Sequence, residues 1–96
     1  MEAAGIKIGF VSRQQPDPVR LAQMLIYEIE CQGRETEIFV DEDLALQIGR
    51  QGTSVAEMER QKVDFIVSVG GDGTILRTIH KMVDPAPILG INMGTL

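Results

Sequence analysis

The sequence predicts an α/β domain in which helices cover both faces of a parallel sheet, giving three layers. Short apolar, β-branched segments alternate with segments of helical period along the chain, and this alternation is typical of parallel sheets with helical crossovers. Residues 63–69 contain Asp64 and Ser68 as their only polar members, as expected for a central strand buried on both faces. A length of 96 residues fits one such domain.

The first part of the chain is predicted to form a strand, a helix and a second strand. Residues 6–11 are apolar and β-branched, as in a short strand. A helix follows, because Asp17 can cap it and Pro18 fits its first position. Apolar residues then recur at helical spacing as far as Gly33, which is a plausible helix stop. Residues 35–40 alternate in polarity as a second strand.

The middle of the chain is predicted to be less regular. Residues 41–43 form an acidic break, and residues 44–51 an irregular or partly helical connection, because two glycines weaken a helix there. Ser54 and Glu57 match a capping box, in which the glutamate reaches back to the cap. This box predicts a short helix that runs to about Gln61.

The last part of the chain is predicted to form strand, helix and strand again. The apolar run 63–69 is the third strand, and a helix with Met82 and Val83 on its apolar face follows a glycine turn. Prolines at 85 and 87 end that helix. Residues 88–91 form a fourth strand, and a second glycine-containing loop begins at Asn92. Both glycine loops fall at strand carboxyl ends, where such sheets bind ligands.

Composition narrows the function classes. The net charge is −5, so binding to nucleic acid or to an anionic membrane by bulk electrostatics is disfavoured. No apolar run approaches the roughly 20 residues of a membrane span, and the N-terminus lacks the basic region of a signal peptide. The one cysteine, Cys31, cannot form a disulfide within the chain. We therefore expect a cytoplasmic protein with small-molecule ligands.

The residues Gly70-Gly71-Asp72-Gly73-Thr74 join the buried strand to the next helix. Glycines let a backbone approach a ligand closely, and a helix N-terminus presents N–H groups that bind phosphate. Beside phosphate, Asp72 needs a role such as accepting a proton from a nucleophile or holding a metal ion. The other interpretation is structural, with Asp72 as the cap of a helix that begins near Gly73 or Thr74. The spacing does not match a Walker loop, because no Lys-Ser or Lys-Thr follows the glycines. It does not match the dinucleotide fingerprint either, because position 76 is Leu.

Two motifs together carry a family resemblance. Residues 70–77 read GGDGTILR, and residues 88–96 read ILGINMGTL. They resemble the NAD kinase family, which reads G-G-D-G-T-x-L and then G-x-N-x-G-x-L-G-F-L. The resemblance covers essentially the whole chain, residues 1–96, as the family's N-terminal domain. It implies a three-layer Rossmann-like parallel sheet of the type shared by 6-phosphofructokinases and NAD kinases.

The resemblance implies phosphoryl transfer from ATP or polyphosphate to the 2′-hydroxyl of the adenosine ribose of NAD, giving NADP. Asp72 aligns with the family's catalytic proton acceptor. Mg²⁺ or another divalent cation is implied as the ion that bridges donor oxygens and offsets the repulsion between Asp72 and phosphate. No metal ligand is assigned among the residues of the chain itself.

The implied nucleotide-binding residues divide by their expected contacts. The three glycines of the turn offer backbone contacts to donor phosphates, and Asp72 and Gly73 also meet the nucleotide substrate. Thr74 either binds a phosphate oxygen or caps the helix, Leu76 packs beside the substrate, and Arg77 contacts the nucleotide. Residues of the second loop shape the wall of the adenine-side pocket. The complete set is Gly70, Gly71, Asp72, Gly73, Thr74, Leu76, Arg77, Asn92 and Gly94.

The sequence also departs from the family pattern. The Asn-Glu dipeptide, which in the family lies in a C-terminal β-rich domain that binds NAD, does not occur here, and the Gly-Phe-Leu tail is absent. We expect this chain to be the N-terminal part of a longer polypeptide that forms a homo-oligomer, and to be inactive alone. Two alternatives are open: a related lipid or sugar kinase, and a non-catalytic nucleotide-binding module in which Asp72 is only a cap.

Other candidates receive structural interpretations. Arg13 lies at a strand carboxyl end, where it either reaches donor phosphates or is an exposed loop residue. His80 is expected to be solvated near a helix end, and Cys31 to be buried or half-buried. The acidic residues 41–43 are interpreted as a solvated loop in preference to a metal cluster, and the methionines as core filler.

Overall fold

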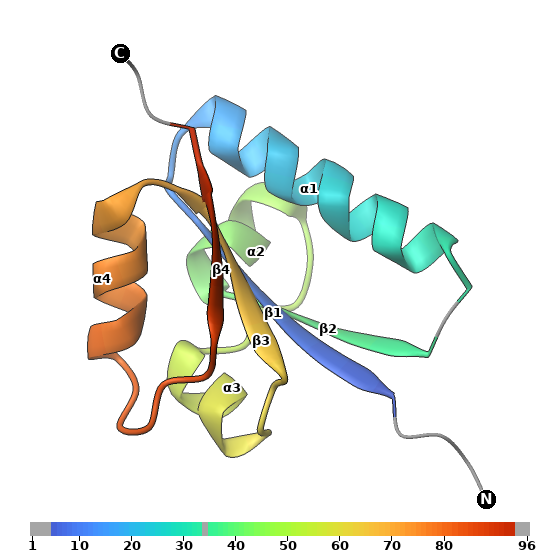
Figure 1. The fold of residues 1–96 in the computed structure, drawn as a ribbon. Helices are drawn as coiled ribbons and strands as arrows, with labels where there is room; N and C mark the ends of the chain where they lie inside the picture. The colour runs from blue at the N-terminus through green and yellow to red at the C-terminus, as the bar shows by residue number, and fades with distance from the viewer. Residues whose placement is uncertain (1–4, 34, 94–96) are drawn as a thin grey trace, which may run out of the picture.

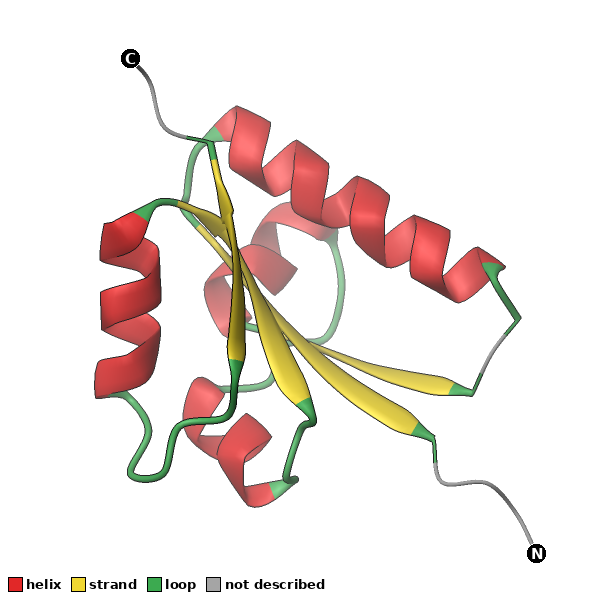
Figure 2. Cartoon of the chain, viewed as in Figure 1, coloured by secondary structure: helices red, strands yellow, loops and turns green. Residues whose placement is uncertain are grey.

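The computed structural model describes residues 5–33 and 35–93, and it confirms the predicted α/β architecture (Figures 1 and 2). Four parallel strands form one sheet in the order β2-β1-β3-β4. The strands are β1 (Ile6–Ser12), β2 (Thr36–Val40), β3 (Phe65–Gly70) and β4 (Ile88–Asn92), and the helices are α1 (Pro16–Cys31), α2 (Glu42–Ile48), α3 (Val55–Arg60) and α4 (Asp72–His80). Among the described helices, none combines the length and apolar character needed to cross a bilayer.

The strand order places a topological switch between β1 and β3. The chain leaves β1 toward β2 on one side of the sheet and leaves β3 toward β4 on the other. Ligands of open parallel sheets bind at such a switch, outside the carboxyl ends of the strands. In the register, Ser12 pairs with Val69 and Gly70 pairs with Asn92. The loops that follow β1, β3 and β4 therefore meet at one edge.

Both faces of the sheet are buried against helices. On one face, Phe10 and Val67 pack with Ala22 and Ile26 of α1. On the other face, Ile66 packs with Met58 and other apolar residues of α3. Burial on both faces explains why residues 63–69 are nearly continuously apolar rather than alternating.

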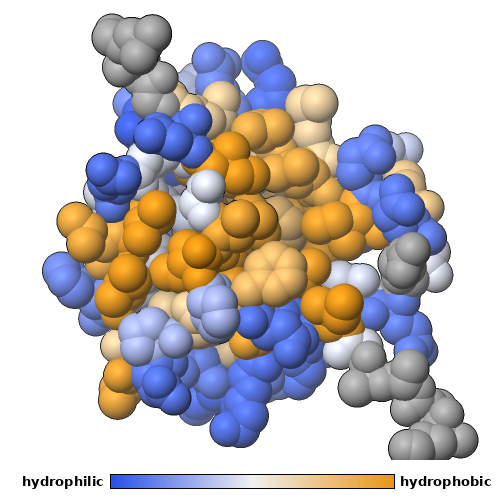
Figure 3. Space-filling view, in the orientation of Figure 1, coloured by the Kyte–Doolittle hydropathy of each residue, from blue (hydrophilic) through white to orange (hydrophobic). Residues whose placement is uncertain are grey.

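Strand β4 is covered less completely than the central strands. Leu89 pairs with Val67 and so points to the α1 side of the sheet, but its side chain is 56% exposed. The contacts of α1 fall mainly on β1 and β3. Figure 3 shows apolar side chains gathered over the middle of the face on which β4 and α1 lie. The domain thus presents an open apolar surface beside its edge strand.

Helix α1 begins two residues earlier than predicted. Its N-cap is Gln15, which makes no side-chain cap hydrogen bond, and Pro16 is the first helical residue. The prediction that Asp17 caps this helix is wrong, since Asp17 lies in the first turn. Prolines are tolerated there because the first N–H groups of a helix have no intrahelical partner. The predicted stop is confirmed, with Gly33 at a φ of 70°.

The acidic break is the start of a helix rather than a solvated loop. Asp41 is the N-cap of α2, and its Oδ2 accepts the N–H of Asp43 at 3.2 Å. Only 9% of Asp41 is exposed. The helix ends at Gly49, which has a φ of 69°. We expected Gly49 to weaken a helix over residues 44–51, whereas it forms the C-terminal cap of α2.

Smaller differences have local causes. The capping box of α3 forms by half: the Ser54 hydroxyl accepts the N–H of Glu57, whereas the Glu57 carboxylate binds Arg60 and Gln61. Val83 is 96% exposed because α4 ends at His80 and helical spacing no longer applies. Cys31 is exposed at the last residue of α1, which contradicts its predicted burial.

The methionines divide between core and surface. Met58 is fully buried and Met82 nearly so, as predicted. Met24 is exposed because it lies two residues from both Ala22 and Ile26, on the outer side of α1. His80 is exposed at the end of α4, as predicted.

Asp41 makes the stability of the fold depend on pH. Desolvation by burial raises the pKa of its carboxyl, and this effect outweighs the attraction of Lys81 and the hydrogen bond from Asp43. The unfolded chain therefore loses this proton at a lower pH than the folded chain does. The stability that the folded chain gains by holding this proton is fully present at pH values below the pKa of the unfolded chain. It is lost as the pH rises through the pKa of the folded chain.

The variant Asp41→Asn tests this linkage. Asparagine caps helices about as well as aspartate but carries no charge to desolvate. We expect a higher free energy of unfolding than wild type at about pH 7, and a difference that disappears near pH 3, where both side chains are neutral. Denaturant titrations at the two pH values measure this. A variant that is less stable than wild type by the same amount at both values would contradict the prediction.

Candidate functional site

The turn between β3 and α4 requires glycine at position 70. Gly70 has a φ of 153°, a conformation that side-chain-bearing residues rarely adopt. A Cβ at this position would stand 2.8 Å from the Thr74 hydroxyl oxygen and 3.0 Å from the Cβ of Arg13. The chain therefore turns sharply here because no side chain intervenes between the strand and the helix.

Asp72 does not cap the helix that it begins. The N-cap of α4 is Gly71, no side chain makes a cap hydrogen bond, and Asp72 is the first helical residue. The N–H groups of Thr74 and Ile75 donate to the carbonyl of Gly71 at 3.1 and 3.3 Å. The interpretation of Asp72 as a helix cap is therefore wrong, and its carboxylate is available for another role.

Four of the predicted residues share one exposed face of α4. Asp72, Gly73, Leu76 and Arg77 are all exposed, and their spacing of one, four and five residues places them on neighbouring positions of a helix. Arg77 Nη1 lies 3.9 Å from where a Cβ on Gly73 would stand. The carboxylate, a cation and an apolar side chain are thus presented together at the start of the helix.

Thr74 faces inward. It is only 5% exposed, and its carbonyl accepts the Thr78 hydroxyl at 2.8 Å. Its own hydroxyl lies against the backbone of Gly70. The structure thus places Thr74 beneath the turn, where it supports the turn from inside; a phosphate contact by its hydroxyl stays a prediction.

The ends of β1 and β4 complete the site. The N–H of Arg13 donates to the carbonyl of Val69 at 2.8 Å. Arg13 Nη2 lies 3.0 Å, and Asn92 Oδ1 4.0 Å, from where a Cβ on Gly71 would stand. The structure therefore brings Arg13 and Asn92 to the glycine turn from either side. Gly94 lies outside the described residues.

A small polar cavity of about 40 Å³ lies behind this surface. Its lining includes Arg77 and Thr78 of α4, the end of β1 at Ser12, and Asp41 and Asp43 at the start of α2. The Ser12 hydroxyl is buried without a hydrogen-bond partner. We did not predict Ser12 or Asp41 near Arg77. The available signal was position, since Asp41 directly follows β2 and so falls at the same sheet edge.

The carboxylates around the turn suit a cation that phosphates help to hold. Among the described residues, no three His, Cys, Asp or Glu side chains gather in a way that would hold a metal ion. Mg²⁺ is commonly bound by one or two carboxylates together with substrate phosphates. The described residues at the glycine turn therefore fit a cation held mainly through phosphate oxygens.

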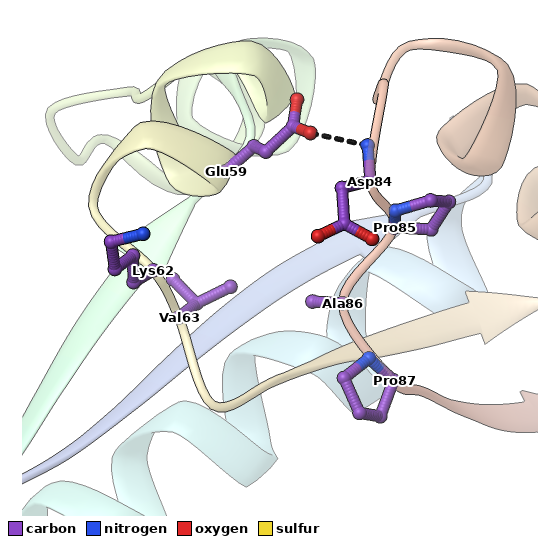
Figure 4. A pocket seen from close by; sticks show the side chains of 7 residues that line it. All are labelled: Glu59, Lys62, Val63, Asp84, Pro85, Ala86 and Pro87. Carbon is purple, nitrogen blue, oxygen red and sulfur yellow. Dashed lines mark hydrogen bonds between the residues drawn. The ribbon is translucent and has the colours of Figure 1, made fainter.

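A larger cavity lies at the opposite edge of the sheet, away from the turn. It has a volume of about 400 Å³ and lies between the end of α3 and the loop before β4 (Figure 4). Glu59 crosses from α3 and accepts the N–H groups of Val83 at 3.0 Å and Asp84 at 2.5 Å. Its lining carries the carboxylates of Glu59 and Asp84 against one cation, Lys62. Because carboxylates outnumber the cationic side chain, this cavity is not suited to binding phosphate.

Comparisons with known proteins agree on one family. Residues 9–96 match the family described as the ATP-NAD kinase N-terminal domain. The chain is 44% identical over 91 residues to a NAD kinase of Methanosarcina mazei, covering 94% of this chain and 30% of that protein. It is 41% identical over 93 residues to a NAD kinase of Thermococcus kodakarensis, covering 95% of this chain and 33% of that protein.

A solved structure shows the same fold. It is the crystal structure of a NAD kinase from Archaeoglobus fulgidus in complex with ATP, with a TM-score of 0.57 and 30% sequence identity. The similarity covers 93% of this chain and 28% of that one. The chain thus spans about a third of the length of the relatives it matches. On these matches and on the site's geometry, the chain belongs to the NAD kinase family, as its N-terminal domain.

Proposed function

We propose that this chain supplies the phosphoryl-donor side and the proton acceptor of a NAD kinase active site. The observation that carries the proposal is the exposed Asp72 carboxylate at the first residue of α4, with no capping role, on a turn of three glycines. The reaction is phosphoryl transfer from ATP or polyphosphate to the 2′-hydroxyl of the adenosine ribose of NAD. The ATP complex of the Archaeoglobus fulgidus relative supports a nucleotide donor.

The geometry suits each step that the protein's own groups perform. The N–H groups at the start of α4 and the positive end of its dipole hold the donor phosphates. Asp72 takes the proton of the attacking hydroxyl, or orients that hydroxyl in line with the donor phosphorus. Leu76 packs beside the nucleotide substrate, and Arg77 binds it. A divalent cation such as Mg²⁺, held by donor oxygens, would neutralise charge on the phosphates.

The acceptor side of the site belongs to a second, β-rich domain in this proposal. Asn92 and Gly94 form the wall of the adenine-side pocket where the two domains meet. The open apolar surface beside β4, with Leu89 exposed, supports packing against further protein, because soluble monomers rarely expose large apolar patches. The proposal also includes a cytoplasmic location and a homo-oligomer formed by the complete polypeptide.

A chimera tests the role of Asp72. In it, this chain replaces the matching stretch of the Methanosarcina mazei NAD kinase. Because Asp72→Asn removes the proton acceptor but leaves the capping of α4 unchanged, we expect kcat for NADP formation to fall about 10²-fold or more, with the KM for ATP changed less than about threefold. Turnover is followed by coupled NADP detection.

The matched control is Asp84→Asn, which removes one carboxylate at the opposite edge of the sheet. It is expected to retain turnover within about twofold. If the Asp72→Asn and Asp84→Asn chimeras have similar kcat values, the chain is a nucleotide-binding module without a catalytic carboxylate.

The 96-residue chain alone is expected to be inactive, because it holds only the donor side of the site. Incubation with ATP, Mg²⁺ and NAD should give no NADP above that of the Asp72→Asn chain. Nucleotide binding should be weak, since the contacts of the second domain are missing. Turnover by the wild-type chain above that of the variant would show that the site is already complete.

A further inference from the structure

Arg13 is the residue at the site that the proposed function leaves without a role. It follows β1, far from the glycine motif in sequence, yet its backbone N–H is bonded to Val69 at the end of β3. Its side chain then runs along the turn, with Cβ 3.0 Å from the Cβ position of Gly70 and Nη2 3.0 Å from that of Gly71. The guanidinium therefore lies beside the turn, next to Gly71.

No carboxylate neutralises this guanidinium among the described residues. The ion pairs found there are Arg50 with Glu30 and Arg60 with Glu57. The side-chain hydrogen bond of Arg13 is to a neutral acceptor, Gln15 Oε1, at 3.3 Å. A cation that is placed by the backbone and left without a counter-charge has donors available for an anion.

The two arginines of the site lie beside the two glycines that flank Asp72 in the sequence. Arg13 reaches Gly71, the residue before Asp72, whereas Arg77 reaches Gly73, the residue after it. The Gly71 side is formed by the ends of β1 and β3 and by the N-cap of α4. The first N–H groups of a helix are suited to binding phosphate. The Gly73 side leads along the exposed face of α4 to Leu76, where the nucleotide substrate is proposed to lie.

We infer that Arg13 is a donor-phosphate ligand and that the two guanidinium groups divide the substrates between them. Arg13 binds the polyphosphate of the donor over Gly71, and Arg77 binds the acceptor nucleotide. Arg13 thereby supplies the counter-charge that a polyanion needs beside Asp72, in a domain whose net charge is −5. This inference rests on the proposed function. It adds Arg13 to the binding residues and assigns each of the two arginines to one substrate.

The chimera described above separates the two assignments by steady-state kinetics. We expect Arg13→Gln to raise the KM for ATP about 10- to 100-fold, as for loss of hydrogen bonds to a charged group, with the KM for NAD changed less than about threefold. Arg77→Gln should do the reverse. Arg13→Lys should recover part of the affinity for ATP, because it keeps the charge but loses the planar fork. Arg60→Gln, an exposed arginine on α3, controls for loss of one positive charge.

The outcomes distinguish this inference from the proposed function. If Arg13→Gln leaves the KM for ATP unchanged, or raises both KM values equally, the inference is overturned, while the Asp72→Asn result still decides the function. If the wild-type chimera shows no turnover, calorimetric titration of the 96-residue chain with inorganic tripolyphosphate decides instead. Weaker binding by Arg13→Gln than by wild type and Arg60→Gln supports the inference, and equal affinities or no detectable binding overturn it.

Discussion

The site depends on the backbone conformation of Gly70. With a φ of 153° and no Cβ, this residue turns the chain from β3 into α4 within a space bounded by Thr74 and Arg13. The turn fixes where α4 begins, and so fixes Asp72 as its first residue and Gly71 as its N-cap. A side chain at position 70 would push against both neighbours, and the start of the helix would move. The position of Asp72 at the exposed start of α4 follows from this constraint.

In the proposed function, this acidic domain binds a polyanion only through local charge. The N-cap of α4 and the guanidinium of Arg13 both lie at Gly71, where we propose that phosphate binds, while the carboxylate of Asp72 is the group that a hydroxyl acceptor would meet. This arrangement accounts for an aspartate at a position where phosphate alone would disfavour one. It also explains why a net charge of −5 argues against nucleic acid but not against a nucleotide.

Most of the fold was predictable because local pattern and tertiary environment agree. Most of the apolar run 63–69 lies in strand β3, which begins at Phe65 and is covered on both faces. The glycine motif forms a strand-to-helix turn at the sheet's carboxyl edge. The errors arise where a local signal has two interpretations. The acidic residues 41–43 indicated a loop by charge, whereas Asp41 serves as a cap and is buried. Asp17 has a capping side chain, but Pro16 already starts the helix.

The parts of the site that sequence could not place are those that depend on side-chain reach across elements. Arg13 and Asn92 are 79 positions apart in the sequence, and only the register of β1, β3 and β4 brings both to Gly71. The inward orientation of Thr74 likewise depends on its packing beneath Gly70. A motif indicates which residue types a site contains, whereas the register of the sheet determines where each side chain lies around the turn.

The most direct test of this account is to map ATP on the chain by amide chemical-shift changes at millimolar ligand. We expect the largest changes at the amides of Gly70 to Gly73 and at Arg13, with little change around Glu59 and Asp84 at the opposite edge of the sheet. If the largest changes instead surround the Glu59 cavity or the apolar surface beside Leu89, the donor phosphates do not bind at the glycine turn.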